Sequence, residues 1–162
     1  DAKISAVYTV KRASVALDFI RQVIRDMELD LTVAMKDGDN DDTVITVDGE
    51  GAGLLIGHHG ETLDSLQYLA NLAANKKIKG EKHDYVKITL DIEGYRAKRE
   101  EALRKLAMRM ANRARKSGHR VALEPMNPSA RRILHSALQN DPEVTTHSEG
   151  EEPYRRVIIT LK

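Results

Sequence analysis

The residues best placed to do chemistry gather around a four-residue turn, Gly57-His58-His59-Gly60. Apolar residues precede the turn at 54–56, and apolar residues at helical spacing follow it from Leu63. Glycine has no Cβ and tolerates positive φ, so two glycines would let a second backbone pass close to the turn. The N–H groups at the start of the following helix would then face the phosphates of a nucleic-acid strand. A tight helix–helix connection is the alternative interpretation.

His58 and His59 place two imidazoles in the middle of this turn. Imidazoles are mostly neutral near pH 7, so binding through them would strengthen at lower pH. They would either hydrogen-bond phosphate or base, or be solvated. A metal site with Glu61 or Asp64 is disfavoured because adjacent histidines rarely converge on one ion. We expect an aspartate at position 60 to repel phosphate with little loss of thermal stability.

A second group of candidates lies in a basic helix expected at 95–116. Its nine cations are Arg96, Lys98, Arg99, Arg104, Lys105, Arg109, Arg113, Arg115 and Lys116. Only two acidic residues accompany them, so the pattern favours a phosphate-contacting face, with Arg109 and Arg113 as contacts, over a solvated charged face. Downstream, Asn127-Pro128 opens a helix. Arg131 and His135 lie four residues apart on one side of that helix.

The composition bounds the function. Of 162 residues, 41% are apolar and 31% charged, which is typical of a folded globular chain. Six residues are Phe or Tyr and none is Trp, so we do not expect base stacking to be the main binding device. The absence of Cys excludes disulfides and is compatible with a cytoplasmic protein. No apolar run approaches the length of a membrane span. Asp1 in place of Met predicts a fragment or a processed chain.

The charge is uneven along the chain. Residues 1–93 carry 11 Lys/Arg and 17 Asp/Glu, whereas residues 94–162 carry 15 and 8. An acidic half beside a basic half predicts two domains, 1–92 and 93–162, with an anionic partner for the second.

The periodicities predict an α+β fold. In the first half we expect a helix capped by Thr9 that ends near Met27, strands at 29–35 and 43–47, the turn with its two helices to Asn75, and a strand at 85–90. The apolar stripe of the helix after the turn would include Leu63, Leu66, Leu69 and Leu72. In the second half we expect helices at 95–116 and 127–139, a short strand at 120–123 and a closing hairpin at 144–161.

The order of elements in the first half, with Ile-Gly-x-x-Gly between two helices, resembles a type II KH domain. The resemblance implies a three-stranded sheet with three helices on one face. Single-stranded RNA would lie between the turn and the third strand, with about four nucleotides clamped. The lysine loop would border that groove with Lys76, Lys77, Lys79 and Lys82. His58 and His59 stand where such turns usually carry a basic residue, which reduces the expected charge of the clamp.

The stretch Met126-Asn-Pro-Ser-Ala-Arg-Arg-Ile-Leu-His135 resembles the R-three-H domain, a small α+β fold whose matching residues here are Arg131 and His135. A type II KH domain followed by this domain is similar to the bacterial Jag family, also called SpoIIIJ-associated protein or KhpB/EloR. The resemblance implies binding of single-stranded RNA, or DNA, in the cytoplasm and a role in cell elongation and division. It also implies a small stand-alone KH protein as partner, and leaves a membrane protein insertase or a homodimer open.

Three classes of function remain. The first is a single-strand RNA-binding module with two contact surfaces. The second is a protein-interaction adaptor with a KH fold and weak or no RNA binding. The third, a hydrolase built on the turn histidines, ranks last because no nucleophile elbow, phosphate loop or zinc-helix motif is present. We therefore expect no enzyme, no catalytic residue, no metal and no cofactor.

Overall fold

The computed structural model describes residues 2–38, 42–76 and 85–162, with side chains from residue 12 onward. They form two compact units that divide between Arg96 and Ala97. Each unit has its own hydrophobic core, and each is described by itself below.

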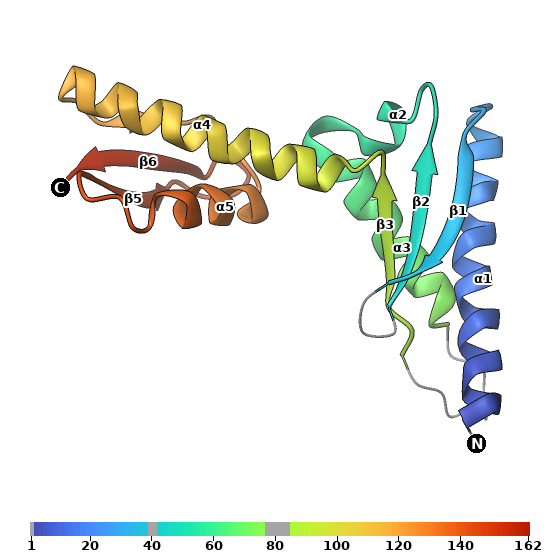
Figure 1. The fold of residues 1–162 in the computed structure, drawn as a ribbon. Coiled ribbons are helices and arrows are strands. Elements are labelled where there is room, and N and C mark those ends of the chain that lie inside the picture. The colour runs from blue at the N-terminus through green and yellow to red at the C-terminus, as the bar shows by residue number, and fades with distance from the viewer. Residues whose placement is uncertain (1, 39–41, 77–84) are drawn as a thin grey trace. The chain divides into compact units, whose positions relative to one another are not determined.

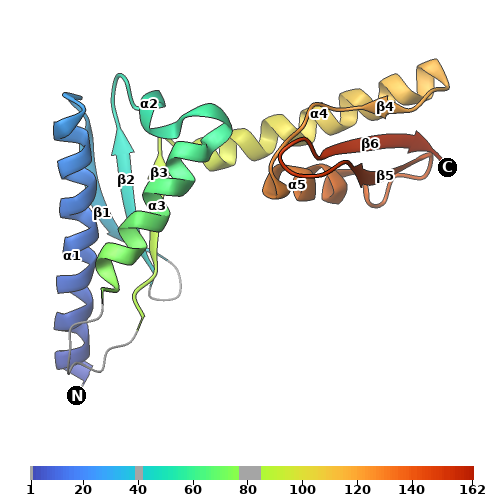
Figure 2. The same ribbon diagram turned by 180° about the vertical axis from the view of Figure 1, so that it is seen from behind.

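The first unit is a three-stranded sheet backed by helices (Figure 1). Its elements are α1 (Ala2–Asp26), β1 (Thr32–Asp37), β2 (Thr43–Asp48), α2 (Gly53–Ile56), the short 3-10 helix η2 (His58–Gly60), α3 (Glu61–Ala74) and β3 (Ile88–Ile92). The order β1-β2-β3 pairs β1 with β2 antiparallel and β2 with β3 parallel. Figure 2 shows α1 and α3 side by side on one face of this sheet.

The core of the first unit follows from the alternation of the two inner strands. Ile45 and Val47 of β2 are fully buried, and the residue between them is not. Alternate side chains of a strand point to opposite faces of the sheet, so one face of β2 and β3 is apolar. That face packs against α1 and α3, which contribute Ile20, Leu63 and Ala70.

The second unit packs two helices on a small antiparallel sheet of order β4-β6-β5. Its elements are α4 (Tyr95–Ser117), β4 (Val121–Ala122), α5 (Pro128–Leu138), β5 (Val144–Glu149) and β6 (Arg156–Leu161). Ala107, Ala111 and Ala114 form the buried stripe of α4, and small side chains there let the helix lie close to Leu134 and Ile159. Asn127 caps α5 as expected, with its side chain accepting a hydrogen bond from Ala130 N at 2.9 Å.

The α+β fold class and the order of elements are confirmed, whereas several boundaries were wrong. The first helix starts at Ala2 and not after Thr9, because no helix-breaking residue lies upstream. β1 begins at Thr32 and β3 at Ile88, three residues later than expected in each case. Apolar residues that precede each strand continue its alternating pattern, so the sequence placed the start of each strand too early.

The apolar stripe of α3 was also partly wrong. Leu63 and Leu66 are buried together with Ala70 and Ala74, but Leu69 and Leu72 are 46% and 51% exposed. Their spacing fits a helix, yet it places them on the face away from the sheet. The outer face of α3 is consequently apolar and open to solvent.

Candidate nucleic-acid interface

The Gly57–Gly60 turn has a backbone that requires glycine at both ends. Gly57 has φ 69° and ψ −167°, a region that is essentially restricted to glycine, and Gly60 has φ 91° and ψ 9°. A Cβ on Gly57 would lie 2.0 Å from Thr62 Oγ1, and one on Gly60 would lie 2.9 Å from Tyr95 Cε1. The absence of a Cβ at these glycines therefore permits close packing against Thr62 and Tyr95 inside the unit, in addition to any close approach of a nucleic-acid backbone.

This packing corrects our expectation for aspartate at position 60. Gly60 is buried against the ring of Tyr95, and its φ is left-handed. An aspartate there would strain the fold as well as repel phosphate, so its effect on binding would not be separable from its effect on stability.

The two histidines between the glycines lie on the surface. His58 and His59 are both exposed, with ring centroids 3.9 Å apart and ring planes inclined by 42°. His59 has φ 55°, a left-handed conformation that His, Asn and Asp tolerate better than most residues. The turn thus presents two adjacent imidazoles to solvent at the start of α3.

The start of α3 carries carboxylates rather than fixed positive charge, and the N–H of Glu61 donates to His58 O. No side chain caps the helix at Gly60, and the first turn carries Glu61 and Asp64. Asp64 pairs with Arg96 at 2.9 Å, which offsets one of these carboxylates. Of the predicted lysine loop, Lys76 is exposed beyond the end of α3. Lys77, Lys79 and Lys82 lie outside the described residues.

In the second unit, some cations of α4 form ion pairs with glutamates of the same helix, whereas others line a pocket. Arg104 pairs with Glu100 at 2.6 Å and Lys105 with Glu101 at 3.2 Å. Arg109 and Arg113, by contrast, line an open pocket together with Asn112, Lys116 and Ser117. Within the described ranges neither arginine lies within 4.0 Å of a carboxylate, so their charge is available to an anion. The structure brings these two predicted residues to one surface.

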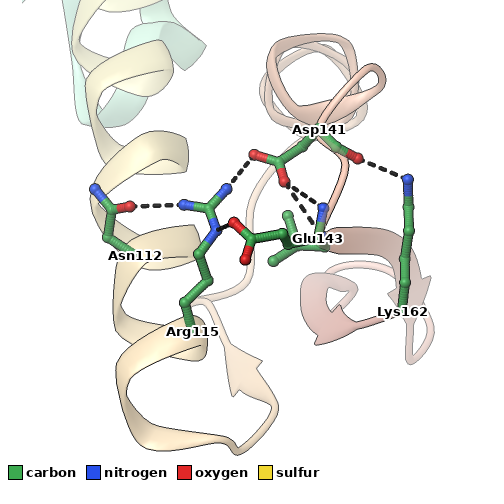
Figure 3. A network of polar contacts seen from close by, with 6 residues as sticks. Asn112, Arg115, Asp141, Glu143 and Lys162 are labelled. Atoms are coloured by element: carbon green, nitrogen blue, oxygen red, sulfur yellow. Dashed lines mark hydrogen bonds and ion pairs between the residues drawn. The ribbon is translucent and has the colours of Figure 1, made fainter.

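Arg115 belongs to a different surface of the same helix (Figure 3). It donates to Asn112 Oδ1 at 2.6 Å and to Asp141 Oδ2, and its Nε lies 2.8 Å from Glu143 Oε2. The hydrogen bond from Arg115 lowers the pKa of Asp141 and is the main reason that the pKa of Arg115 is raised. The ion pairs of Arg115 thus connect the end of α4 to the loop before β5.

Arg131 is turned inward. The residue is only 8% exposed, and its guanidinium donates to Met126 O at 2.6 Å and to Glu152 Oε1 at 2.5 Å. These contacts connect α5 to the segment before it, at Met126, and to the loop between β5 and β6, at Glu152. Its neighbour Arg132 is exposed and is therefore the more accessible cation of α5.

His135 is held between α5 and β5. Its Nδ1 lies 2.7 Å from Thr146 Oγ1 and its Nε2 lies 2.9 Å from Ser148 Oγ. Burial, followed by the charges of Arg131 and His147, lowers the pKa of His135. The ring lines a polar pocket whose wall includes Arg132 and Lys162.

Sequence reasoning thus missed Asn112 and Arg132, which line these pockets, and it named Lys116 only as one of the nine cations of the basic helix. The spacing of Arg109, Asn112, Arg113 and Lys116 at i, i+3, i+4 and i+7 would have identified one helical face. Nothing in the sequence distinguishes the buried Arg131 from the exposed Arg132, because the difference depends on Glu152, which is distant in the chain.

Two features of the described residues bear on other functions. No three His, Asp or Glu side chains within the described ranges are arranged to hold a metal ion. None of the helices described is long and apolar enough to cross a membrane.

Comparison with known proteins matches both units. Residues 13–90 match the KH domain of KhpA/KhpB, and residues 101–161 match the R-three-H domain. The chain is 43% identical over 148 residues to the RNA-binding protein KhpB of Clostridium symbiosum, covering 91% of this chain and 65% of that protein. It is 39% identical over 118 residues to the RNA-binding protein KhpB of Bacillus subtilis, covering 72% and 55%. For the protein of the same name in Lactiplantibacillus plantarum the identity is 35% over 145 residues, covering 90% and 44%.

These matches, with the fold, define a protein that carries a KH domain followed by an R-three-H domain. The chain spans between 44% and 65% of the length of these curated relatives. It belongs to the bacterial KhpB (Jag) family.

Proposed function

We propose that this chain binds single-stranded RNA through two surfaces, the turn at 57–60 and the cation face formed by Arg109, Arg113 and Lys116. The cation face carries the proposal, because three cations on one side of α4 share an open pocket and none forms an ion pair with a carboxylate among the described residues. Phosphate is the anion that single-stranded nucleic acid presents in a row. The names of the relatives, RNA-binding protein KhpB, support RNA as the ligand.

The proposed role of the turn is to hold the backbone of the strand. The exposed histidines and the uncapped start of α3 both offer hydrogen bonds to phosphate. We propose a binding role rather than catalysis for this arrangement. Membership of the KhpB (Jag) family extends the proposal to a post-transcriptional regulator that acts in the cytoplasm in cell elongation and division. DNA single strands would bind the same phosphate contacts.

The test is the affinity of the whole chain for a mixed pool of short single-stranded RNAs. His58→Asp combined with His59→Asp adds two negative charges to the turn at exposed positions, and aspartate tolerates the left-handed φ of residue 59. We expect the affinity to fall at least tenfold, or about 1.4 kcal/mol.

The matched control adds the same charge elsewhere on the first unit. Thr32→Asp combined with Ala34→Asp places two carboxylates on exposed positions of β1, which lies at the edge of the sheet. We expect this variant to bind RNA within about threefold of wild type, given the screening of distant charges by salt. Equal losses in both double variants would remove the turn from the binding surface.

A second candidate function is docking of another protein. Leu69 and Leu72 on the outer face of α3 are about half exposed, and an exposed apolar strip favours a protein contact. We propose that a small stand-alone KH protein docks there. Leu72→Glu should abolish a complex with such a protein in light scattering, whereas Met27→Glu, an equivalent change at another exposed apolar residue, should leave it intact. A membrane protein insertase or a second copy of this chain would be distinguished by the mass of the complex.

The adaptor alternative makes a separate prediction. If the chain binds a protein partner but no RNA at low salt, the docking face is its function and the cation face of α4 serves another anion.

A further inference from the structure

The outer edge of β3 and of the segment that leads into it is covered by side-chain amides of α3 and of its C-cap residue, Asn75. Asn71 donates to Ile88 O at 2.7 Å and accepts from Ile88 N at 2.9 Å. One turn further along the helix, Asn75 donates to Val86 O at 2.7 Å and accepts from Val86 N at 2.8 Å. Gln67 accepts from Leu90 N at 3.0 Å. These three amides, spaced four residues apart, form an amide ladder along the strand edge that β2 leaves unpaired.

The central amide of the ladder has no hydrogen-bonding capacity left. The two N–H groups of Asn71 go to Gln67 O and Ile88 O. Its oxygen accepts from Ile88 N and from the hydroxyl of Tyr85 at 3.2 Å. An asparagine side chain has two donors and two acceptor lone pairs, so all four are in use. The backbone groups of Ile88 and the Asn71 amide are therefore already hydrogen-bonded and are not available to a base that lies along this edge.

Tyr85 lies across this covered edge. Its hydroxyl reaches Asn71 on α3 while its backbone leads into β3, so the ring bridges the helix and the strand. The residue is nevertheless 68% exposed, which leaves most of the ring surface open to solvent. A tyrosine fixed by its hydroxyl with an open ring is suited to stack on a flat, apolar group.

The ring lies within reach of a strand held at the turn. Asn71 lies eleven positions after Gly60, which corresponds to about 16 Å along the axis of α3. A stacked strand advances about 3.4 Å per nucleotide, so four or five nucleotides cover this length. A KH domain clamps about four nucleotides.

We propose that Tyr85 is a base-stacking residue of the first unit and that bases there are held by ring contact rather than read at the β3 edge. The inference rests on the proposed function and deepens it by naming what the first unit recognises. Every base has a π face, whereas edge hydrogen bonds distinguish bases, so this surface should tolerate any sequence. It also gives an exposed tyrosine a role that the low aromatic content led us not to expect.

The test compares two ligands of equal length and charge, a uridine oligonucleotide and a stable abasic sugar-phosphate oligomer. Wild type should prefer the oligonucleotide, because only that ligand can stack. Tyr85→Leu should reduce this preference about tenfold while leaving affinity for the abasic oligomer unchanged. Tyr85→Phe keeps the ring and loses only the hydroxyl contact, and should retain the preference within about threefold.

Two controls make each outcome decisive. Tyr154→Leu removes an exposed tyrosine of the second unit and should leave the preference as in wild type. Equal losses from the Tyr154 and Tyr85 variants, or a Phe variant as weak as the Leu variant, would overturn the proposal. So would an unchanged preference in Tyr85→Leu when wild type binds both ligands. A wild type that binds neither ligand would instead refute the proposed function, and this inference with it.

Discussion

The two candidate surfaces differ in what they are made of. The turn of the first unit is a backbone surface, shaped by Gly57 and Gly60 and carrying imidazoles in place of fixed cations. The face on α4 in the second unit is a side-chain surface, with guanidinium groups on a regular helix. The first should therefore be sensitive to shape, and the second to charge and salt.

The largest expected effect comes from changing the shape of the turn. Gly57→Ala puts a Cβ 2.0 Å from Thr62 Oγ1 at a backbone conformation that alanine avoids, and should lower the free energy of unfolding by about 3 kcal/mol. Gly94→Ala, in the same unit at φ 64° with no atom within 4 Å of the added Cβ, should cost only about 1 kcal/mol. Urea denaturation measures both. Equal costs would mean that the contact with Thr62 relaxes freely.

The next prediction compares two adjacent arginines of α5, of which Arg131 is buried and Arg132 is exposed. Arg131→Ala removes a buried guanidinium that makes two hydrogen bonds and should lower the free energy of unfolding by about 2 kcal/mol. Arg132→Ala changes an exposed residue and should alter stability by less than about 0.5 kcal/mol. In RNA titrations the order should reverse, with Arg132→Ala the weaker binder. An Arg131 variant that folds like wild type but binds poorly would restore the direct role that the motif implied.

A third prediction concerns the cation face of α4. Arg109→Ala combined with Arg113→Ala should make the slope of log K against log salt shallower by about 1.4, since each phosphate contact contributes about 0.7 for single strands. Arg104→Ala combined with Lys105→Ala removes the same charge from the same helix, but from side chains paired with glutamates, and should change the slope by less than half as much. Identical slopes in the two variants would show that only total charge matters.

The smallest effect is a pH dependence of stability from His135. Burial lowers its pKa in the folded chain, so the native state binds fewer protons than the unfolded state. Its contribution to stability is therefore complete above pH about 6.5 and is lost as the pH falls toward the lowered value. His135→Asn should flatten the dependence of the melting temperature on pH between pH 7 and 5 relative to wild type. His147→Gln removes one of the charges that lower the pKa of His135 and should flatten this dependence only in part, because burial is the larger cause. Asp141, whose pKa is lowered by Arg115, acts in a separate, more acidic range.

The sequence predicted the elements well because their signals are local. The β-branched run of β2, the Asn127-Pro128 helix start and the glycine turn between two helices each depend on neighbours in the chain, and each was confirmed. The predicted strand boundaries were wrong where apolar residues extend beyond the strand, as they do before β1 and β3. The burial of Leu63 and the exposure of Leu72 could not be separated, because both fit a helical period and only the packed sheet selects one face.

The site was predicted less completely because its chemistry depends on distant partners. Arg109 and Arg113 lie on one open face, as the helical spacing indicates. Arg131 lies against Glu152, and His135 against Thr146 and Ser148, which the spacing of α5 alone does not indicate. Whether each predicted residue contacts RNA stays a prediction, which the matched variants above are designed to test.

The amide ladder has a further consequence for how the protein behaves at high concentration. An unpaired strand edge is a template on which another chain can extend the sheet, which is a common route to aggregation. Gln67, Asn71 and Asn75 supply β3 with the partners that a neighbouring strand would otherwise provide. They do so from a helix, so that the sheet is terminated at β3 without a further strand. Replacing Asn71 by leucine should therefore increase self-association before it unfolds the domain.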